Sequence, residues 1–573
     1  MKFSEVADIY EKLEKTTKRL ELTAIIRDFI KRVDSEHLPK VLLLLCGEIF
    51  PKYSDKEVGI ASQLMIKAIS LATGLSEAEV ENSWKELGDL GLAAEKALKE
   101  RKQFTLLREE ITVEKIFQNL EKCAELTGPG TVDKKISLVA ELISNASPKE
   151  AKYIVRLILG ELRVGVAEGI IRDAIAQAFL IKDLSNRKEV EEATKAVEYA
   201  WNILSDFGEV ARIAKEEGIN GLRKVKPVLG KPIQLMLGEK APSIQEVLKE
   251  FGKLAAEWKY DGMRAQCHKK GDKVWIFTRR LEDVTKQFPD LVKLCKECLI
   301  PNECIVEGEV LGIDPKTGYP LPFQVLSQRI HRKYEIERMV KEIPIQMNLF
   351  DVVYVDGETF FDKPFKERRK ILEKIVKVKK GKFQLAKQIV TDSLEELEKF
   401  YHEALNAKQE GIFLKVLNSP YMFGRRVGGW YKIKPVMETL DLVIVGATWG
   451  TGKRAGWLGS FVLACRDEST GKFLRCGMLG TGIKEKKENP EDVTFEDLTE
   501  LLKPHIIKES GTHVERAPHL VVEVAYQEIQ KSPNYESGFA LRFPRLVRIR
   551  FDKSPDECDT VERVKKLYEM QKR

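Results

Sequence analysis

The pattern of apolar and polar positions divides this 573-residue chain into a helical first part and a β-rich remainder. Up to about residue 225, apolar side chains recur at intervals of three and four residues, which is the period of one face of an α-helix. Three such sets are Val6, Ile9, Tyr10 and Leu13; Ile26, Phe29, Ile30 and Val33; and Ile171, Ala174, Ile175 and Ala178. We expect this part to fold as packed helices.

One helix start can be located from side-chain chemistry. Ser147 precedes Pro148, and Glu150 follows three residues after the serine. A serine N-cap, a proline in the first turn and a glutamate that closes a capping box predict a helix that begins here. Gly160 and Gly165 then interrupt the pattern, so we expect a break between two helices.

A proline- and glycine-rich segment, residues 225–243, separates the two parts and cannot form one long helix. Beyond it, short runs rich in β-branched and aromatic residues predict strands at 274–277, 304–306 and 349–354. Helical stretches are expected near 364–377 and 393–408.

From about residue 436 the pattern is again one of short strands between turns. The strands are predicted within 440–450, 460–467 and 520–530. A segment of this size and pattern is typical of a small β-barrel. We therefore expect three domains, which comprise residues 1–231, 232–435 and 436–573.

Charge and composition narrow the function only slightly. The chain carries 96 basic and 89 acidic residues, a formal net charge of +7. This mild excess is compatible with a nucleic-acid partner and equally with an ordinary solvated surface. The sequence has no run of about 20 apolar residues that would predict a membrane span, and its N-terminus lacks the apolar segment of a signal peptide. We expect a cytoplasmic protein with no membrane partner.

The chain contains nine cysteines, and this odd number argues against a disulfide framework. Cys295, Cys298 and Cys304 form the one cluster. A structural zinc ion usually takes four ligands. We therefore expect buried thiols, with a zinc site as the alternative.

The sequence EWKYDGMR, residues 257–264, carries the strongest chemical signal. A lysine that attacks phosphorus must be deprotonated, and desolvation or neighbouring cations would provide this form of Lys259. Gly262 would allow a sharp turn, and Arg264 offers a fork of donors to a phosphate or ribose. A charged turn between two strands is the alternative interpretation.

Five further motifs follow in order: TRR at 278–280, EGEV at 307–310, LFD at 349–351, EGIFLK at 410–415 and WYKIK at 430–434. Together with Lys259-x-Asp261-Gly262-x-Arg264, they resemble the motif series of the covalent nucleotidyltransferases. That superfamily includes DNA ligases, RNA ligases and mRNA capping enzymes. Six matches in the right order over about 175 residues are far more specific than any one of them, because independent chance matches multiply.

The resemblance implies a role for each motif. Lys259 would carry AMP on its amine, Glu257 would accept a hydrogen bond from the adenine amino group, and Arg264 would contact the ribose. The other implied nucleotide-binding residues are Arg279, Glu309, Phe350, Arg426, Lys432 and Lys434, with Phe350 stacked on adenine. The implied ligands of Mg2+ are Glu309 and Glu410, with Mn2+ as the alternative metal. Taken singly, each carboxylate could be a surface residue and Phe350 a core residue.

The C-terminal segment LRFPRLVRIRFDK, residues 541–553, resembles the C-terminal motif of ATP-dependent DNA ligases. That resemblance implies that Arg548, Arg550 and Lys553 orient the pyrophosphate of ATP in the first step. Alternation along the segment predicts a cationic face and an opposite apolar face made of Val547, Ile549 and Phe551. A solvated edge strand is the alternative.

Other segments favour a DNA ligase within the superfamily. Residues 439–446 and 450–456 resemble the start of the ligase OB-fold domain. Residues 157–168 resemble the DNA-binding domain of the replicative archaeal and eukaryotic ligases, which capping enzymes and most small RNA ligases lack. The four-cysteine zinc module of bacterial NAD-dependent ligases has no counterpart in the sequence, which favours ATP.

The resemblance therefore implies an all-α DNA-binding domain (1–231), an α+β nucleotidyltransferase or adenylation domain (232–435) and a β-barrel OB-fold domain (436–573). We expect an ATP-dependent DNA ligase that seals nicks in duplex DNA through enzyme–AMP and DNA–AMP intermediates, in DNA replication, repair, recombination and cell division. We also expect a monomer, with Gln103 and Phe104 as a candidate contact for a sliding clamp. The alternatives are an RNA ligase or capping-type nucleotidyltransferase and a catalytically inactive DNA-binding scaffold. The sequence does not determine whether ADP, NAD or GTP can replace ATP.

Overall fold

The computed structural model describes residues 1–101, 109–128, 130–162, 164–330, 332, 334–424, 429–435, 438–450, 454, 456–489, 492–510 and 513–571. The chain forms two compact units. The first comprises Met1–Tyr401 and Ile412–Ile433, and the second comprises His402–Gly411 and Lys434–Arg573. Among the described residues, no helix is long and apolar enough to cross a membrane.

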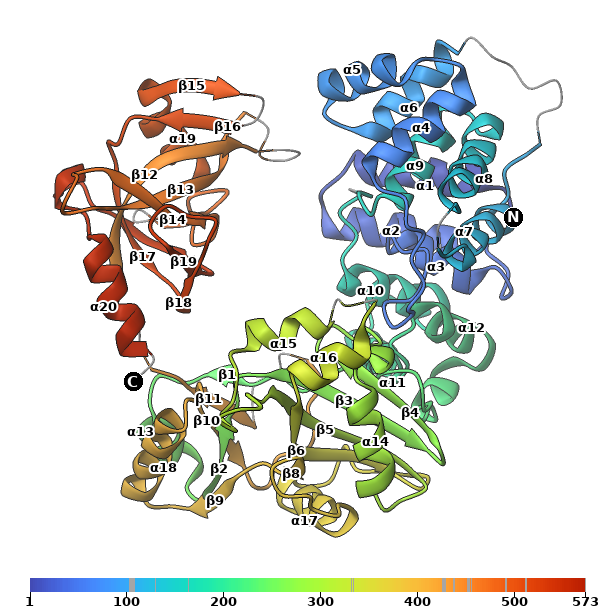
Figure 1. Cartoon of the computed structure of the whole chain (residues 1–573). Coiled ribbons are helices and arrows are strands. Elements are labelled where there is room, and N and C mark those ends of the chain that lie inside the picture. Colours follow the sequence, from blue (N-terminus) through green and yellow to red (C-terminus); the bar gives the residue numbers. More distant parts are fainter. Residues whose placement is uncertain are drawn as a thin grey trace. The chain divides into compact units, whose positions relative to one another are not determined.

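The first unit begins with a helical region, coloured blue to teal in Figure 1. Its helices are α1 (Phe3–Glu14), α2 (Arg19–Ile30), α3 (Leu38–Leu45), α4 (Ser62–Thr73), α5 (Glu77–Leu87), α6 (Leu90–Lys99), α7 (Val113–Glu125), α8 (Val132–Asn145), α9 (Pro148–Ile158), α10 (Glu168–Phe179), α11 (Arg187–Leu204) and α12 (Phe207–Arg223). They share one hydrophobic core. The apolar positions expected on the inner face of α1 are all buried, so the helical period was interpreted correctly.

The predicted start of α9 is confirmed. The Ser147 side chain accepts a hydrogen bond from the Glu150 backbone N–H at 3.3 Å, and the Glu150 carboxylate accepts one from the Ser147 N–H at 2.8 Å. The expected break after α9 is also present. Gly160 and Gly165 have φ angles of +67° and +69°, a left-handed backbone that favours glycine.

Two sheets form the rest of the first unit (Figure 1). The smaller has the order β1 (Glu239–Lys240), β11 (Trp430–Ile433), β10 (Gly411–Val416), β2 (Leu254–Lys259) and β9 (Gln388–Thr391). The larger has the order β4 (Lys273–Thr278), β3 (Met263–Lys270), β5 (Glu303–Gly312), β6 (Ile345–Val355) and β7 (Glu358–Thr359), with β8 (Phe383–Leu385) paired to β6. The accompanying helices are α13 (Ile244–Phe251), α14 (Pro289–Cys298), α15 (Phe323–Ile330), α16 (Ile336–Glu342), α17 (Phe365–Ile375) and α18 (Leu394–Asn406).

The clustered cysteines lie in the core of the larger sheet. Cys295, Cys298 and Cys304 are buried there together with Cys267. Burial raises the pKa of the Cys304 thiol to about 12, which keeps it protonated. The described residues contain no group of three or more His, Cys, Asp or Glu arranged to hold a metal ion. The prediction of buried thiols is confirmed.

The second unit is built on a seven-stranded sheet with the path β14 (Phe473–Leu479), β13 (Leu458–Arg466), β12 (Leu440–Trp449), β16 (His513–Arg516) and β15 (Ile506–Ser510). In addition, β17 (Val521–Ala525) pairs with both β12 and β20 (Arg545–Ile549). A separate hairpin pairs β18 (Glu528–Lys531) with β19 (Phe539–Arg542), and the helices are α19 (Phe495–Leu502) and α20 (Val561–Gln571). Residues 520–530, within which a strand pattern was predicted, form parts of the two strands β17 and β18.

The predicted apolar face of the C-terminal motif is wrong for Val547 and Phe551, whereas Ile549 is partly buried and packs against the core of this unit. Val547 and Phe551 are 50% and 74% exposed, whereas Leu546 is buried. Leu546 pairs with Val524 and Arg548 pairs with Glu523, so Val547 is an extra residue in a β-bulge. A bulge interrupts the strict alternation on which the prediction depended, and Phe551 lies beyond the end of β20.

Candidate active site

Lys259 is the last residue of β2 and lies directly before the turn that leads into β3. The Lys259 amine lies 5.6 Å from the ring centroid of Phe413 on the neighbouring strand β10. The side chain is partly buried. Because β2 belongs to the smaller sheet and β3 to the larger one, the chain passes from one sheet to the other directly after Lys259, the nucleophile identified from the sequence.

Gly262, in that turn, is required for a reason other than the one expected. Its φ angle is not in the left-handed region. A Cβ atom at this position would instead lie 2.3 Å from the Val310 carbonyl oxygen and 2.9 Å from the Leu311 side chain. Glycine thus allows the turn to pack directly against β5, the strand that carries Glu309.

Arg264, on β3, is held in a fixed orientation. Its Nη2 donates to the Glu307 carboxylate at 2.8 Å and its Nη1 donates to the Met236 carbonyl at 2.6 Å. The guanidinium carbon lies 5.3 Å from the Phe350 ring centroid and 5.5 Å from that of Trp430. Although burial opposes it, the Glu307 carboxylate raises the pKa of Arg264. Arg264 Nε is buried and has no hydrogen-bond partner among the described residues, so a donor is available to a ligand.

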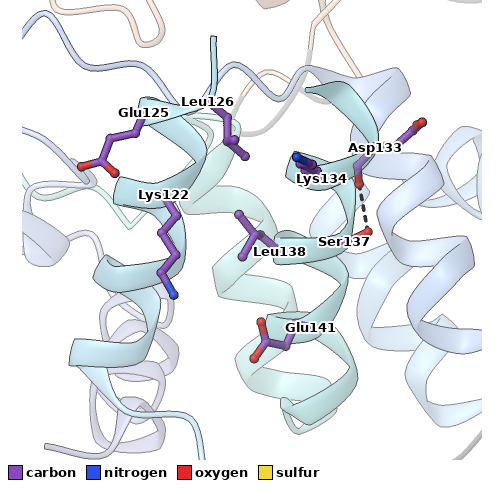
Figure 2. Close-up of a pocket in the computed structure, with 8 residues that line it drawn as sticks. All are labelled: Lys122, Glu125, Leu126, Asp133, Lys134, Ser137, Leu138 and Glu141. Carbon is purple, nitrogen blue, oxygen red and sulfur yellow. Dashed lines mark hydrogen bonds between the residues drawn. The ribbon is translucent and has the colours of Figure 1, made fainter. Parts of the chain in front are cut away.

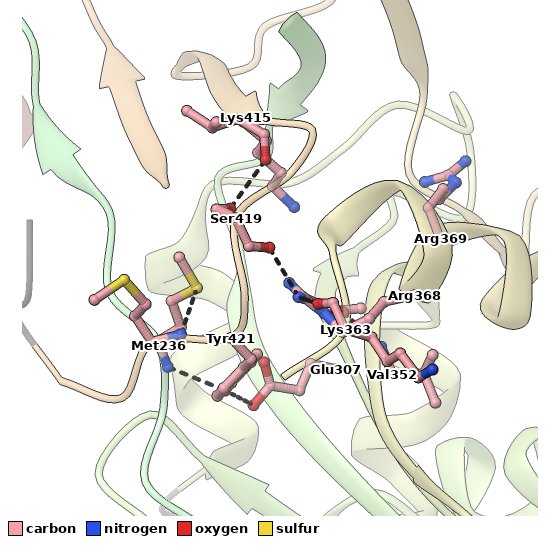
Figure 3. A network of polar contacts seen from close by, with 12 residues as sticks. Met236, Glu307, Val352, Lys363, Arg368, Arg369, Lys415, Ser419 and Tyr421 are labelled. Carbon is pink, nitrogen blue, oxygen red and sulfur yellow. Dashed lines mark hydrogen bonds and ion pairs between the residues drawn. The ribbon is translucent and has the colours of Figure 1, made fainter. Parts of the chain in front are cut away.

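Glu307 is a site residue that the sequence analysis missed. It is fully buried and also accepts a hydrogen bond from Gln266 Nε2 at 3.0 Å. A further hydrogen bond comes from the hydroxyl of Tyr421 at 2.9 Å, which lies beside Glu307 in Figure 3. Glu307 and Glu309 are two residues apart on one strand, so their side chains point to the same face. The EGEV motif alone therefore did not reveal which carboxylate pairs with Arg264.

Glu257, on β2, lies inside the protein with a side chain only 2% exposed. One carboxylate oxygen accepts hydrogen bonds from Gln388 at 2.8 Å and from Arg369 at 3.2 Å. The other forms an ion pair with the Lys415 amine at 2.5 Å. Donors from β9, α17 and β10 thus fix this carboxylate, and a buried carboxylate with cationic donors is a strong acceptor.

Lys415 is the second residue that was missed, although it is the last residue of the quoted EGIFLK motif. Its amine lies 4.1 Å, 4.7 Å and 4.8 Å from the ring centroids of Trp430, Phe350 and Phe365. Burial lowers the pKa of Lys415, while the Glu257 carboxylate opposes that shift. The aromatic ring predicted to stack on adenine therefore lies beside this buried cation.

The remaining predicted residues of the first unit lie on β5, on β11 and after β4. Lys432 is partly buried on β11, opposite Phe413 on β10. Glu309 is partly buried on β5, and Arg279 is exposed at the turn after β4. Arg426 lies outside the described residues, as do the two residues considered for clamp contact, Gln103 and Phe104.

Glu410 and Lys434 belong to the second unit and form an ion pair with each other. A residue predicted to bind metal is therefore paired with one predicted to bind phosphate. In the C-terminal motif, too, cations predicted to bind the nucleotide form ion pairs with carboxylates. Arg548 pairs with Glu523 at 2.6 Å, and Lys553 pairs with Asp441 at 2.7 Å.

Three family models match the chain. They describe a DNA ligase N terminus at residues 2–176, an ATP dependent DNA ligase domain at 235–434 and an ATP dependent DNA ligase C terminal region at 454–553. The DNA ligase of Nanoarchaeum equitans is 52% identical to this chain over 573 residues, which is 100% of this chain and 99% of that one. Those of Thermococcus fumicolans and Archaeoglobus fulgidus are 47% and 46% identical, with 100% of this chain and 99% of each relative covered.

The chain belongs to the ATP-dependent DNA ligase family. This ligase is thus an enzyme that forms phosphodiester bonds, and the family resemblance stated from its motifs is confirmed. Because the match extends over the full length and includes the helical region, an RNA ligase, a capping-type enzyme and an inactive scaffold are all disfavoured.

Solved structures show the same fold. The ligase matches the structure named Pmar-Lig_Pre. with a TM-score of 0.56, although only 17% of the aligned residues are identical. The match covers 95% of this ligase and 99% of that chain. At this identity the likeness concerns the fold alone.

A groove of about 610 Å3 lies in the helical region between α7 and α8 (Figure 2). Its lining comprises Lys122, Glu125, Leu126, Asp133, Lys134, Ser137, Leu138 and Glu141. None of these belongs to the ligase motifs, and the lining contains both acidic and basic residues. The groove gives no reason to move the candidate active site away from Lys259.

Proposed function

We propose that this ligase seals nicks in duplex DNA with Lys259 as its nucleophile. The Lys259 amine attacks the α-phosphorus of ATP, forms a P–N bond and releases pyrophosphate. The AMP then passes to the 5′-phosphate at a nick, and the adjacent 3′-hydroxyl attacks that phosphate and releases AMP. Phosphoryl transfer of this kind depends mainly on positioning and on charge stabilisation. The observation that carries the proposal is the position of Lys259 at the end of β2, two residues after the fixed carboxylate of Glu257 and with its amine 5.6 Å from the Phe413 ring centroid.

Nucleotide recognition follows from the same side chains. We propose that Glu257 accepts from the adenine amino group, Phe350 stacks on the base and Arg264 donates to the ribose. The unpartnered Nε of Arg264 supports the last assignment. Further positive charge would come from Arg279, Arg426, Lys432 and Lys434.

We propose Mg2+ as the metal, with Glu309 and Glu410 as its carboxylate ligands and Mn2+ as the alternative. Carboxylate oxygens suit a hard cation that usually keeps waters and phosphate oxygens in its shell. Such a metal would neutralise the charge on the triphosphate and so lower the barrier to attack. Lys434, as the ion-pair partner of Glu410, would orient that carboxylate.

Nicked duplex DNA would be bound by three domains with the boundaries predicted from the sequence, 1–231, 232–435 and 436–573. Hydrophobic clusters within residues 3–222, 263–383 and 440–567 support this division, and a further cluster joins Ile203 to Ile233, Met236 and Ile305 across the first boundary. The helical domain would bind DNA through its phosphates, and the last domain would be an OB-fold barrel. We also propose that the ligase acts as a monomer and that Gln103 and Phe104 contact a sliding clamp.

The C-terminal motif would act in the first step only. We propose that the last domain covers the nucleotide, so that Arg548, Arg550 and Lys553 stabilise the departing pyrophosphate. The domain would then turn away about the short Lys434–Pro435 connection to bind DNA. In Arg550→Ala or Lys553→Ala proteins, lysine adenylation should fall strongly, while sealing of a nick that already carries AMP should continue.

A labelling experiment tests the proposed nucleophile. The Lys259→Ala protein should remain folded but fail to form a covalent adduct with ATP labelled on the α-phosphate, and it should not seal nicks. Lys253→Ala is the matched control, because this exposed lysine precedes the same strand. Labelling of the Lys259→Ala protein at the wild-type level would show that another residue carries AMP.

A further inference from the structure

Two cations of the C-terminal motif converge on a single carboxylate, that of Asp441. Arg550 Nη1 donates to both carboxylate oxygens of Asp441, at 3.0 Å and 2.8 Å. The Lys553 amine donates to Oδ2 of the same residue at 2.7 Å. Such a convergence of cationic donors is the geometry with which proteins bind a phosphate oxygen.

Asp441 is held rigidly, whereas the second partner of Arg550 is not. Asp441 lies near the start of β12, where its N–H donates to the Asp559 carboxylate at 2.7 Å and its carbonyl accepts from the Asp559 N–H at 2.7 Å. Asp552, which accepts from Arg550 Nε and Nη2, is 66% exposed at its side chain, against 12% for Asp441. Asp441 therefore acts as a fixed anion in the cationic site.

The charges of the side chains that pair directly balance, and the nearby Asp559 carboxylate adds a further acidic group to the cluster. Arg550 and Lys553 carry two positive charges, and Asp441 and Asp552 carry two negative ones. A cation that is fully neutralised by its neighbours offers little attraction to a second anion. Since Arg550 and Lys553 are proposed to stabilise pyrophosphate, one of their present partners must give way before they can do so.

We infer that Asp441 occupies a phosphate-binding site formed by Arg550 and Lys553, and that both cations turn from this fixed carboxylate to the β- and γ-phosphates of ATP during lysine adenylation. When pyrophosphate leaves, Asp441 pairs with both cations again and so opposes rebinding of pyrophosphate and reversal of the step. The inference deepens the proposed function and rests on the step-one role of these two cations. It makes Asp441 a positioning residue, because it acts through the cations and not on the reacting atoms.

The test uses the full-length Asp441→Asn protein, which keeps the shape of the side chain and removes its charge. We expect a lower KM for ATP in lysine adenylation and stronger inhibition by inorganic pyrophosphate, each by about three- to tenfold, the range expected for loss of one partly exposed ion pair. Release of AMP from the adenylated enzyme by added pyrophosphate should accelerate similarly. Glu536→Gln is the matched control, since it frees Arg475 from a pair elsewhere in the same domain.

Sealing of a nick that already carries AMP serves as the folding control. That step involves no pyrophosphate, so the Asp441→Asn protein should perform it at the wild-type rate. A wild-type KM and wild-type pyrophosphate inhibition would overturn the inference, as would a loss of both steps together with a lower melting temperature. If Arg550→Ala leaves adenylation intact, the proposed role of the motif fails instead. If Arg550→Ala impairs adenylation and Asp441→Asn does not change it, only the inference about Asp441 fails.

Discussion

Arg264 donates a 2.8 Å hydrogen bond to Glu307, and its guanidinium carbon lies 5.3 Å from the centroid of the Phe350 ring. The buried carboxylate thus holds the arginine beside the aromatic ring that is proposed to stack on adenine. A side chain held in this way loses less conformational freedom when a nucleotide binds. The two acidic residues of the EGEV motif thus have different roles. Glu307 holds Arg264, whereas Glu309 is only partly buried and is the proposed metal ligand.

Glu307→Gln and Glu309→Gln should therefore have different effects on stability and on adenylation. The first change leaves Arg264 buried without its counter-charge, which should destabilise the fold by about 3 kcal/mol and raise the KM for ATP. The second should leave the melting temperature near that of the wild type and raise the Mg2+ concentration needed for adenylation. Thermal unfolding and Mg2+ titrations measure both effects. A shared Mg2+ dependence and equal melting temperatures would mean that the two roles are assigned wrongly.

Lys415 and Glu257 offer a double-mutant cycle. Lys415→Met should destabilise the protein by about 3 kcal/mol, because the buried Glu257 carboxylate then keeps Arg369 as its one cationic partner among the described residues. Adding Glu257→Gln should restore part of that stability, since the buried carboxylate charge is then removed as well and Arg369 keeps its pair with Glu373. Both proteins should bind ATP poorly. Denaturant unfolding of the single and double mutants measures the coupling free energy between Lys415 and Glu257. Additive losses of stability would show that their 2.5 Å ion pair contributes little.

Gly262→Ala tests the close packing of the nucleophile turn against β5. The added methyl group would lie 2.3 Å from the Val310 carbonyl, so the turn must move. We expect a loss of about 1–3 kcal/mol in stability and a much larger relative loss of adenylation, because Lys259 lies three residues earlier. Gly480→Ala is the control, since a Cβ there meets only Ser460 at 4.0 Å. Wild-type adenylation by the Gly262→Ala protein would refute the packing argument.

His268 should make folding stability depend on pH. Burial lowers the pKa of this ring to about 3, from the ordinary value of 6.5. Its Nδ1 accepts from the Gly230 N–H at 3.3 Å and its Nε2 donates to Gln266 at 2.9 Å, as in a neutral ring.

The unfolded chain binds a proton at this residue below pH 6.5, while the folded chain does not until about pH 3. His268 therefore leaves the free energy of unfolding unchanged above pH 6.5. Below pH 6.5 it lowers that free energy by about 1.4 kcal/mol for each pH unit, because the unfolded chain binds one more proton. In the His268→Gln protein this part of the loss between pH 6.5 and 4.5 should be absent. If the free energy of unfolding fell equally with pH in the two proteins over this range, the buried ring would not contribute to the pH dependence.

The sequence predicted the elements and the order of the motifs well, since periodicity and capping are local properties. It identified Glu257, Lys259 and Arg264 because they lie within eight consecutive residues. Glu307 and Lys415 were missed as site residues. Their importance comes from partners far apart in the chain, namely Arg264 and Glu257, and only the folded sheets reveal those contacts.

The C-terminal motif shows a second kind of limit. The sequence revealed a row of cations there, but not that Asp441, more than a hundred residues earlier, neutralises two of them. Nor did alternation reveal the bulge at Val547, because a bulge depends on the pairing of β20 with β17. Both features depend on tertiary pairing.

The most direct test of the account is to locate the covalent adduct. The full-length protein, incubated with ATP and Mg2+ without DNA, should gain the mass of one AMP, and peptide sequencing by mass spectrometry should place that mass on Lys259 through an acid-labile P–N bond. Addition of nicked DNA should remove it. An adduct on Lys415 or Lys432, or sealing of nicks without any adduct on the protein, would contradict the account.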